Sequence, residues 1–497
     1  MNARTTRRKF LKAALAGAAV TLLPTGRARA YAANEAVNVA VIGVWNIGQL
    51  DRRWLVQDGA NIVALCDVDR RFLSAAAEEH PQAKTWADFR RMLQEQKDVE
   101  AVMVCTPDHT HAAASMMAMK LGKHVCTEKP LAHSVYEARA LGEAAARCKV
   151  ATQLDNEGHS SPGMARLVEW VQSGAIGKVR QVHAWANQGP PQGPPRGAPP
   201  PWPGAAPMRP VASWDAPAGG PAEAAASAGA SPAAAAGSAQ AGLPGEAPAR
   251  PALAEPPAAP FRRWPPPYLE WDLWVGPAPY RDYHEGLHPA AWRMHWDFGT
   301  GRLGDMGCHL FDGAFWSLKL GHPTTVEAAS EGNTHDRAPQ WAVVTYQFPA
   351  RGDLPPVTLT WYNGGKWPPR PPELREDRSL PPEGSLFIGD EGKILVHGSA
   401  NPQILPAEKM REFQPPEPFI RRSTGHKKEW LEAIRGGPPP GSNFAAYGGP
   451  LTEVVLLGNV AIRTGKKIEW DPVNLRAKNV PEAAAYIRRE YRKGWEL

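Results

Sequence analysis

Cysteine and long apolar runs are both scarce in this chain. The 497 residues include five cysteines, an odd number without paired spacing, and Cys66 and Cys105 lie in apolar stretches typical of strands. This pattern favours buried thiols over a disulfide framework. No set of histidines and glutamates has an established zinc spacing either, so we predict no metal site.

Acidic residues are absent from the first 30 positions, which carry seven basic residues. This segment accounts for the whole formal net charge of +6, since the remainder of the chain carries −1. The basic balance therefore gives no reason to expect a nucleic-acid partner.

The same segment has the pattern of an export signal. Arg7 and Arg8 precede an apolar stretch over residues 13–23, and residues 28–30 form a small-x-small cleavage site. The apolar stretch is too short to span a bilayer, so we predict a Tat signal peptide over residues 1–30 and a mature periplasmic protein without a membrane anchor. The Tat translocase is then a partner during export. A basic N-terminus without a signal is the alternative.

Residues 35–154 alternate between short apolar runs and amphipathic segments. We predict strands at residues 37–43, 62–66, 99–105, 125–128 and 150–154, and helices around residues 50–55 and at 72–79, 86–93, 112–121 and 135–146. Strands that alternate with helices predict a parallel, doubly wound sheet of the Rossmann type.

The spacing changes over residues 155–470. Runs at residues 179–185, 343–348, 357–362, 386–388 and 393–396 are typical of strands in an open, mostly antiparallel sheet, with helices at 310–318 and 426–434. The expected fold class is therefore α/β: an N-terminal Rossmann domain and a C-terminal α+β domain. A tail over residues 471–497 follows.

Residues 189–260 interrupt this second domain. They are dominated by Pro, Ala, Gly and Ser and contain few large apolar residues. Such a segment cannot offset its own ordering entropy, so we predict a disordered insert. A proline-rich recognition segment is the alternative.

A glycine-rich loop with one departure follows the first strand. Residues 43–48 occupy the place of a GxGxxG motif, but Trp45 stands at the middle glycine, which normally lets backbone approach a pyrophosphate. Asp67 ends the second strand 24 residues after Gly43, where a carboxylate binds ribose hydroxyls. We predict a dinucleotide site in which Trp45 either blocks the pyrophosphate or stacks outward and leaves the amides of residues 46 and 47 free.

A lysine and a downstream Asp/His pair carry the chemistry. The tripeptide Glu128-Lys129-Pro130 closes an apolar strand, and Asp305 and His309 are four residues apart, on one face of a helix. Reversible oxidation of a sugar hydroxyl needs a base for the proton, a cation for the developing alkoxide and a carboxylate that orients the base. These residue types can supply all three.

In these motifs the chain resembles the Gfo/Idh/MocA oxidoreductase family, in an exported form with a Tat signal. Besides the lysine tripeptide, the resemblance rests on residues 105–111, 271–277 and 304–309, in the family's order, and it covers residues 37–186 and 264–470. Carried over by position, it implies that Lys129 is the active-site lysine, that His309 accepts and donates the proton, and that Asp305 is the partner of His309.

The loop and the resemblance together predict further site residues. The predicted cofactor-binding residues come from the loop and the strand ends of the first domain: Gly43, Trp45, Asn46, Ile47, Gly48, Asp67, Thr106, Pro107, His109, Glu128 and Lys129. The predicted substrate-binding residues follow the sixth strand or precede the catalytic helix: Asn156, His159, Arg293, Trp296 and Asp297. Helix capping is the alternative for His109 and His111, and core packing is the alternative for the tryptophans.

The resemblance implies an NAD(P)-dependent oxidoreductase acting on a sugar, polyol or related carbohydrate, and a homo-oligomer. Asp67 favours NAD because its carboxylate would repel a 2′-phosphate, whereas Arg70 and Arg71 suit NADP. One alternative is an NAD-dependent glycoside hydrolase or lyase that oxidises the sugar transiently. The other is a carbohydrate-binding protein without cofactor, which Trp45 favours.

Overall fold

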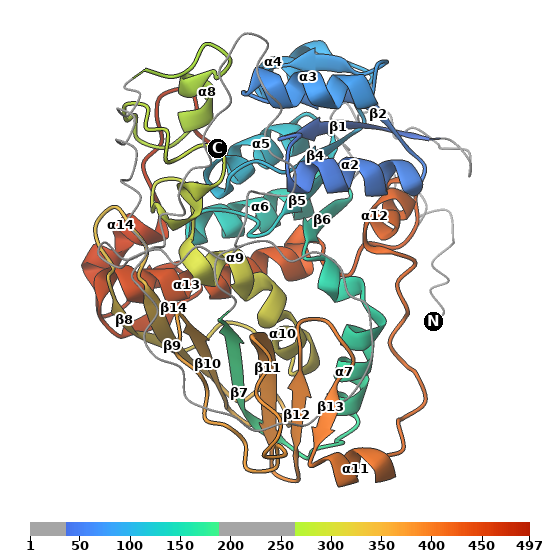
Figure 1. Ribbon diagram of the computed structural model, residues 1–497, viewed down its shortest axis with the longest axis vertical. Coiled ribbons are helices and arrows are strands. Elements are labelled where there is room, and N and C mark those ends of the chain that lie inside the picture. The colour runs from blue at the N-terminus through green and yellow to red at the C-terminus, as the bar shows by residue number, and fades with distance from the viewer. Residues whose placement is uncertain (1–35, 188–263) are drawn as a thin grey trace, which may run out of the picture.

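The computed structural model describes residues 36–187 and 264–497. The predicted signal peptide (1–30) and the predicted insert (189–260) lie outside these residues. The first described part builds a six-stranded sheet with the order β3-β2-β1-β4-β5-β6, which forms the upper layer in Figure 1.

Every strand pair of this first sheet is parallel. Its strands are β1 (Val37–Ile42), β2 (Ala60–Cys66), β3 (Lys84–Trp86), β4 (Ala101–Val104), β5 (His124–Glu128) and β6 (Thr152–Asp155). The connecting helices are α2 (Ile47–Gln57), α3 (Arg70–Glu79), α4 (Phe89–Glu95), α5 (Asp108–Lys120) and α6 (Val135–Cys148). The predicted doubly wound domain is confirmed. Its strand order reverses between β1 and β4, which is where such sheets bind ligands.

A second, nine-stranded sheet has the order β13-β12-β11-β7-β10-β9-β8-β14-β15. Its strands are β7 (Val179–Ala186), β8 (Thr325–Glu331), β9 (Trp341–Phe348), β10 (Val357–Asn363), β11 (Glu383–Gly389), β12 (Lys393–Val396), β13 (Gln403–Leu405), β14 (Ile468–Asp471) and β15 (Arg476–Ala477). All its pairs are antiparallel except β7 with β10. The prediction of a mostly antiparallel second sheet is confirmed.

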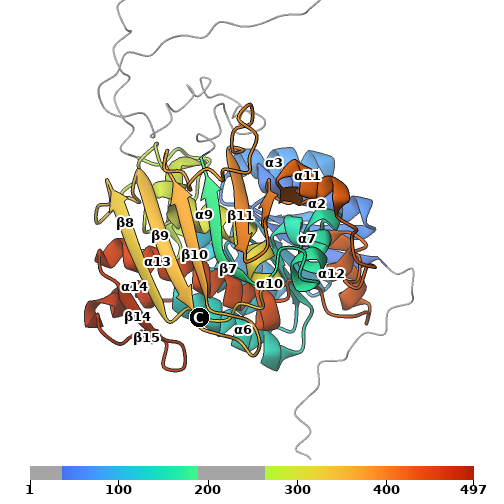
Figure 2. The same ribbon diagram turned by 90° about the horizontal axis from the view of Figure 1, so that it is seen from below.

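Helices cover one face of the second sheet. They include α7 (Pro162–Gln172), α9 (Gly301–Leu310), α10 (Asp312–Ser317) and α13 (Gly449–Thr464). Along β9, buried residues alternate with half-buried ones, as expected when one face packs and the other is open. Figure 2 shows strands β8 to β11 in front of these helices, with the open face toward the viewer.

Helix α13 joins the two layers. It contacts α6 of the first domain and α9, β8 and β9 of the second. Residues 444–464 are long and apolar enough to cross a membrane by length and composition, but 78% of their most apolar stretch is buried inside the protein. Core packing therefore accounts for the apolar composition of this helix.

Residues 264–300 return to the first domain and carry α8 (Trp271–Val275) and η2 (Ala291–Met294). Their aromatic side chains form an apolar cluster of their own, which includes Trp274, Trp292 and Phe298. The Arg70 N–H donates to the carbonyl of Tyr268 at 2.9 Å, which ties this segment to the start of α3. We call residues 264–300 the cover segment.

The C-terminal residues hold the cover segment in place. Arg489 binds Glu137 of α6 at 2.8 Å, and Arg492 binds Asp272 of α8. Trp495 is 5% exposed and packs against Phe89 of α4. The remaining described elements are η1 (Glu157–Ser160), α11 (Ala407–Glu412), α12 (His426–Ile434), η3 (Phe444–Gly448), η4 (Pro481–Ala483) and α14 (Ala484–Ile487).

Among the predicted helices whose bounds differ in the structure, two show why. The helix predicted at 86–93 begins at Phe89, because Trp86 ends the edge strand β3 and pairs with Cys66 of β2. The helix predicted at 310–318 is two elements, since α9 ends at Leu310 and α10 begins at Asp312. A three-residue strand such as β3 depends on its neighbour for hydrogen bonds, so its own sequence does not reveal it.

Candidate active site

The loop between β1 and α2 brings backbone amides to the carboxyl end of the first sheet. Gly43 has a φ of +84°, and a Cβ there would lie 2.7 Å from the backbone of Cys105, so a larger residue does not fit. The N–H groups of residues 45–47 donate no hydrogen bond to the described part of the chain. These amides at the N-terminus of α2 can therefore bind an anion such as a pyrophosphate.

Trp45 turns its ring onto Phe72 of α3. The ring centroids are 4.5 Å apart and the planes differ by 5°, which is a stacked pair. Asn46 follows with a φ of +56°, an uncommon value for a residue other than glycine. Of the two alternatives for Trp45, this geometry matches the one in which the ring stacks outward and leaves the amides of residues 46 and 47 free.

Asp67 directly follows β2 and lies beside this loop. Its two carboxylate oxygens accept the N–H groups of Val44 and Asp69, each at 2.9 Å. Burial raises the pKa of Asp67 to about 6. The carboxylate thus stabilises the loop through these hydrogen bonds. It also lines the cavity between the loop and the cover segment.

Lys129 forms an ion pair with Asp305 of α9. Its Nζ donates to Asp305 Oδ1 at 3.0 Å and to the Asp305 carbonyl at 2.7 Å. Burial opposes charge on both groups, but the attraction to Asp305 raises the pKa of Lys129, and the charges of Lys129 and Arg293 hold the pKa of Asp305 below its usual range. Both groups are therefore charged. This corrects the prediction that Asp305 orients His309, because the carboxylate serves the lysine.

His309 lies one helical turn after Asp305 and lines the same cavity. No hydrogen bond joins its ring to another described residue, so a ring nitrogen is free to accept a proton. Burial, reinforced by the positive charge of Lys129, lowers the pKa of His309 to about 4. At neutral pH the imidazole is an uncharged base.

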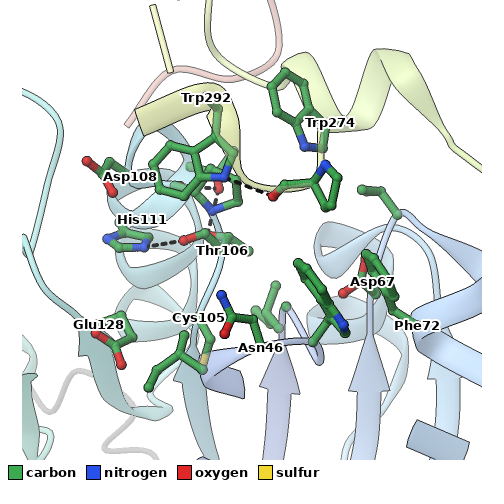
Figure 3. Close-up of a pocket in the computed structure, with 18 of the residues that line it drawn as sticks. Asn46, Asp67, Phe72, Cys105, Thr106, Asp108, His111, Glu128, Trp274 and Trp292 are labelled. Atoms are coloured by element: carbon green, nitrogen blue, oxygen red, sulfur yellow. Dashed lines mark hydrogen bonds between the residues drawn. The ribbon is translucent and has the colours of Figure 1, made fainter. Parts of the chain in front are cut away.

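A cavity of 390 Å³ lies between the loop of the first domain and the cover segment. Figure 3 shows Trp274 and Trp292 of the cover segment on the side opposite Asn46 and Cys105. The predicted site residues that line it are Gly43, Trp45, Asn46, Ile47, Asp67, Thr106, Pro107, Glu128, Lys129, Arg293, Asp305 and His309. Residues from both sheets and from the cover segment therefore meet in one space.

Two predicted cofactor residues lie behind the cavity wall. His109 is fully buried, and its ring nitrogens contact the carbonyls of Trp274 at 2.9 Å and Phe298 at 3.2 Å. It therefore ties α5 to the cover segment, and the N-cap position of α5 belongs to Pro107. Gly48 packs against the start of the loop, since a Cβ there would lie 2.0 Å from the Gly43 carbonyl oxygen.

Four of the five predicted substrate residues are also outside the cavity lining: Asn156, His159, Trp296 and Asp297. The ring of His159 is buried and bonds to Asp312 at 2.9 Å. Trp296 donates to Asn333 at 3.1 Å within the core. Of the predicted substrate residues only Arg293 therefore lines the cavity, whereas the side-chain polar atoms of Asn156 are buried without a hydrogen-bond partner.

Several lining residues were not predicted from the sequence, among them Phe72, Trp274, His288 and Glu157. Glu157 follows β6 directly, and the rule that ligands bind at the carboxyl ends of parallel strands could have located it. Trp274 and His288 had no such signal, because the cover segment reaches the cavity only through tertiary packing.

Sequence profiles of one family match both described parts of the chain. The profile of the Gfo/Idh/MocA oxidoreductase family with its NAD-binding Rossmann fold matches residues 37–155, and that of the C-terminal alpha/beta domain matches residues 261–353. The two profiles match in the family's order, one on each side of residues 156–260.

Curated relatives match mainly through the first domain. The inositol 2-dehydrogenase/D-chiro-inositol 3-dehydrogenase of Lacticaseibacillus casei is 32% identical over 152 residues, which cover 30% of this chain and 44% of that protein. The glycosyl hydrolase family 109 protein 2 of Bacteroides fragilis is 29% identical over 154 residues, covering 29% and 36%. The chain thus spans less than half the length of these curated relatives.

Solved structures share the whole architecture at low identity. The WlbA dehydrogenase from Bordetella pertussis, solved with NADH and UDP-GlcNAcA, has a TM-score of 0.55 at 14% identity and covers 88% of this chain and 99% of its own. The aldose-aldose oxidoreductase from Caulobacter crescentus has a TM-score of 0.51 at 14% identity and covers 88% and 100%. Both domain profiles match and the two-domain fold is shared, so the two matched segments of this chain are similar to the Gfo/Idh/MocA family of oxidoreductases.

Proposed function

We propose that this protein is an NAD(P)-dependent oxidoreductase that acts on a hydroxyl group of a sugar, polyol or related carbohydrate. The observation that carries the proposal is a single cavity lined by the ammonium of Lys129, by the unpaired imidazole of His309 and by the free amides at the start of α2. The amides fit a dinucleotide pyrophosphate, and the lysine and histidine fit a carbinol that loses its proton.

The side chains divide the chemistry between them. A bound dinucleotide would supply the hydride acceptor. His309 is neutral and accepts the hydroxyl proton, while the ammonium of Lys129 stabilises negative charge on the substrate oxygen. Asp305 keeps Lys129 charged and in place through its 3.0 Å ion pair. Arg293 and Trp292 of the cover segment lie on the cavity wall, where a guanidinium and an indole face suit a sugar ring.

The proposal is tested by releasing and identifying the cofactor. We expect denaturation of the purified mature protein to liberate NAD or NADP, or calorimetry to show that the protein binds one of them. A protein that neither contains nor binds a dinucleotide would instead be the carbohydrate-binding protein without cofactor, which carbohydrate binding by the same preparation would demonstrate.

We propose NAD rather than NADP as the cofactor. Both arginines that could bind a 2′-phosphate already have carboxylate partners, Arg70 with Glu270 and Arg71 with Asp69, each at 2.6 Å. Asp67 adds a third carboxyl group beside the expected ribose position, and a 2′-phosphate would be repelled there. Titrating the protein with each dinucleotide should show the higher affinity for NAD.

Replacing Trp45 with glycine should change NAD affinity by less than about tenfold. The indole stacks on Phe72, so its removal uncovers no new amide for the pyrophosphate. Had the ring displaced two charge-assisted hydrogen bonds, the change would be about 3–6 kcal/mol. Calorimetry on both proteins decides the matter, since binding restored only in Trp45→Gly would show that the ring blocks the site.

A second candidate is hydrolysis or elimination of a glycoside through transient oxidation of the sugar. The observation that favours it is the similarity to the glycosyl hydrolase family 109 protein 2 and the alpha-N-acetylgalactosaminidase of Bacteroides fragilis, the latter 28% identical over 154 residues. Release of nitrophenol from aryl glycosides, without net reduction of NAD and lost in Lys129→Ala, would establish this activity in place of net oxidation.

We propose that the protein works in the periplasm after Tat export. The support is the leader of this chain, in which Arg7 and Arg8 precede a short apolar stretch. Replacing both arginines with lysine in a native-like host should leave the precursor in the cytoplasm. Mature protein that still reaches the periplasm in normal amounts would contradict the proposal.

We also propose a homo-oligomer that forms through the open face of the second sheet. The support is the half-buried outward side of β9 and its neighbours, which no described helix covers in Figure 2. Sedimentation of the purified protein should give a mass that is a multiple of the chain mass.

A further inference from the structure

Four carboxyl groups crowd together next to the lysine end of the cavity. Asp51 of α2, Glu128 at the end of β5, and Asp155 and Glu157 at the end of β6 each place one oxygen within 4.8 Å of the others. Three of them are buried, with Asp51 and Asp155 wholly inaccessible. Carboxylates this close cannot all be ionised unless cations lie among them.

Lys427 of α12 supplies one such cation. Its Nζ lies 2.9 Å from Asp51 Oδ1 and also binds Asp155 Oδ2. The ring of His426 lies 3.2 Å from the other oxygen of Asp155. Burial opposes ionisation, but these partners hold the pKa of Asp155 below its usual range. Lys427 therefore balances the negative charge of the two aspartates, whereas the charge of the two glutamates of the cluster still needs an explanation.

Glu128 and Glu157 have no cation of their own among the described side chains, because the ammonium of Lys129 is bound to Asp305. Burial and the charge of Asp155 raise the pKa of Glu128 well above its usual value and that of Glu157 to about 7. Both glutamates therefore hold a proton more readily than usual, and Glu157 is the member whose charge can change near pH 7.

Glu157 is also the partly exposed member of the cluster, and it lines the cavity. The charged and titratable groups around it are Asp51 of α2, Glu128 and Lys129 at the end of β5, Asp155 of β6, His426 and Lys427 of α12, Asp305 and His309 of α9, and the thiols of Cys105 and Cys126. Burial raises the pKa of both thiols well above the usual value, so they stay neutral.

We propose that Glu157 is the proton-exchanging carboxyl group of the cavity, and that its charge sets the relative affinity for the oxidised and reduced dinucleotide. The inference rests on the proposed function. Asp67 lies where the adenosine ribose is expected, at one end of the cavity. Glu157 lies at the opposite end, which would therefore receive the nicotinamide. The oxidised nicotinamide carries a positive charge that the reduced ring lacks, so an ionised Glu157 stabilises the oxidised form more.

The same arrangement balances the proton of the reaction. Oxidation of a carbinol transfers its carbon-bound hydrogen with two electrons to the ring and releases the hydroxyl proton to the protein, where His309 accepts it first. Because reduction would remove the positive charge of a bound nicotinamide, the affinity of Glu157 for a proton would rise, and Glu157 would take up the proton from His309.

The experiment measures the dissociation constants of NAD⁺ and NADH between pH 5.5 and 8.5, with NADH fluorescence as the signal and NAD⁺ as the competitor. As pH rises through the pKa of Glu157, the ratio Kd(NADH)/Kd(NAD⁺) should rise by about tenfold, which is the effect of a one-unit difference in that pKa between the two complexes. The ratio should be constant in Glu157→Gln and vary with pH again in Glu157→Asp.

Glu412→Gln, an exposed glutamate of α11, is the matched control and should behave as the wild type. A pH-independent ratio in the wild type, or the same pH dependence in Glu157→Gln, would overturn the inference while leaving cofactor binding established. If neither dinucleotide binds, the proposed function fails and this inference with it. Thermal unfolding of each variant shows that the proteins compared are folded.

Discussion

Replacing His309 with alanine should lower the turnover of the carbohydrate substrate by about 10²- to 10⁴-fold, the usual contribution of a positioned acid–base group. The neutral imidazole lines the cavity without a hydrogen bond to another described residue, so its loss removes the proton acceptor without opening a structural contact. Lys129→Ala should cause a loss of similar size, because the cation that stabilises the substrate oxygen disappears. Steady-state kinetics on the mature protein measure both effects.

His335→Ala is the control for this experiment, since His335 is exposed and outside the cavity lining. It should retain wild-type turnover. The wild-type rate should also fall as the pH drops through about 4, where His309 becomes protonated and can no longer accept a proton. Near-normal turnover of His309→Ala with a folded protein would mean that another group, with Glu157 the first to examine, accepts the proton.

Replacing Lys427 with methionine should lower the free energy of unfolding by about 3–5 kcal/mol, as expected when one partner of a buried ion pair is removed. Methionine keeps most of the side-chain volume but leaves Asp51 and Asp155 facing each other without a cation. Denaturant titrations at pH 7 measure the loss. The loss in the free energy of unfolding should be smaller at pH 5 than at pH 7, because the two carboxyl groups then take up protons and no longer repel each other.

The neighbouring Lys428 provides a matched control, because it lies on the same helix with an exposed side chain. Lys428→Met should change the free energy of unfolding by no more than about 0.5 kcal/mol. If Lys427→Met were equally mild, the aspartates would have to be protonated in the folded protein. The charge assignment of the whole carboxyl cluster would then be wrong.

The first domain and the lysine end of the site could be predicted from the sequence because local patterns encode them. Strands β1 and β2 are short apolar runs that are followed directly by Gly43 and Asp67, and such runs between helical patterns are typical of a parallel sheet. Lys129 directly follows β5, and side chains at the carboxyl ends of parallel strands meet at one edge. Its place in the cavity therefore follows from chain order alone.

The partner of Asp305 could not be predicted in this way. The helical spacing of four residues favoured His309, but the carboxylate binds Lys129, which is 176 residues away in the chain. A buried ammonium needs a negatively charged partner. The free energy of this ion pair outweighs the weak interaction between side chains four residues apart on one helix. Only the tertiary structure brings Lys129, which follows β5, and Asp305 of α9 together.

The sequence by itself determined the class of the fold, the loop that offers amides to a phosphate, and the lysine and histidine of the site, because each depends on residues close in the chain. The tertiary structure alone decided the ring stacking of Trp45, the cover segment over the cavity and the place of Lys427 among the carboxyl groups. These features bury charge or aromatic surface against distant residues. The free energy of such contacts depends on which segments meet, and short-range pattern does not contain that information.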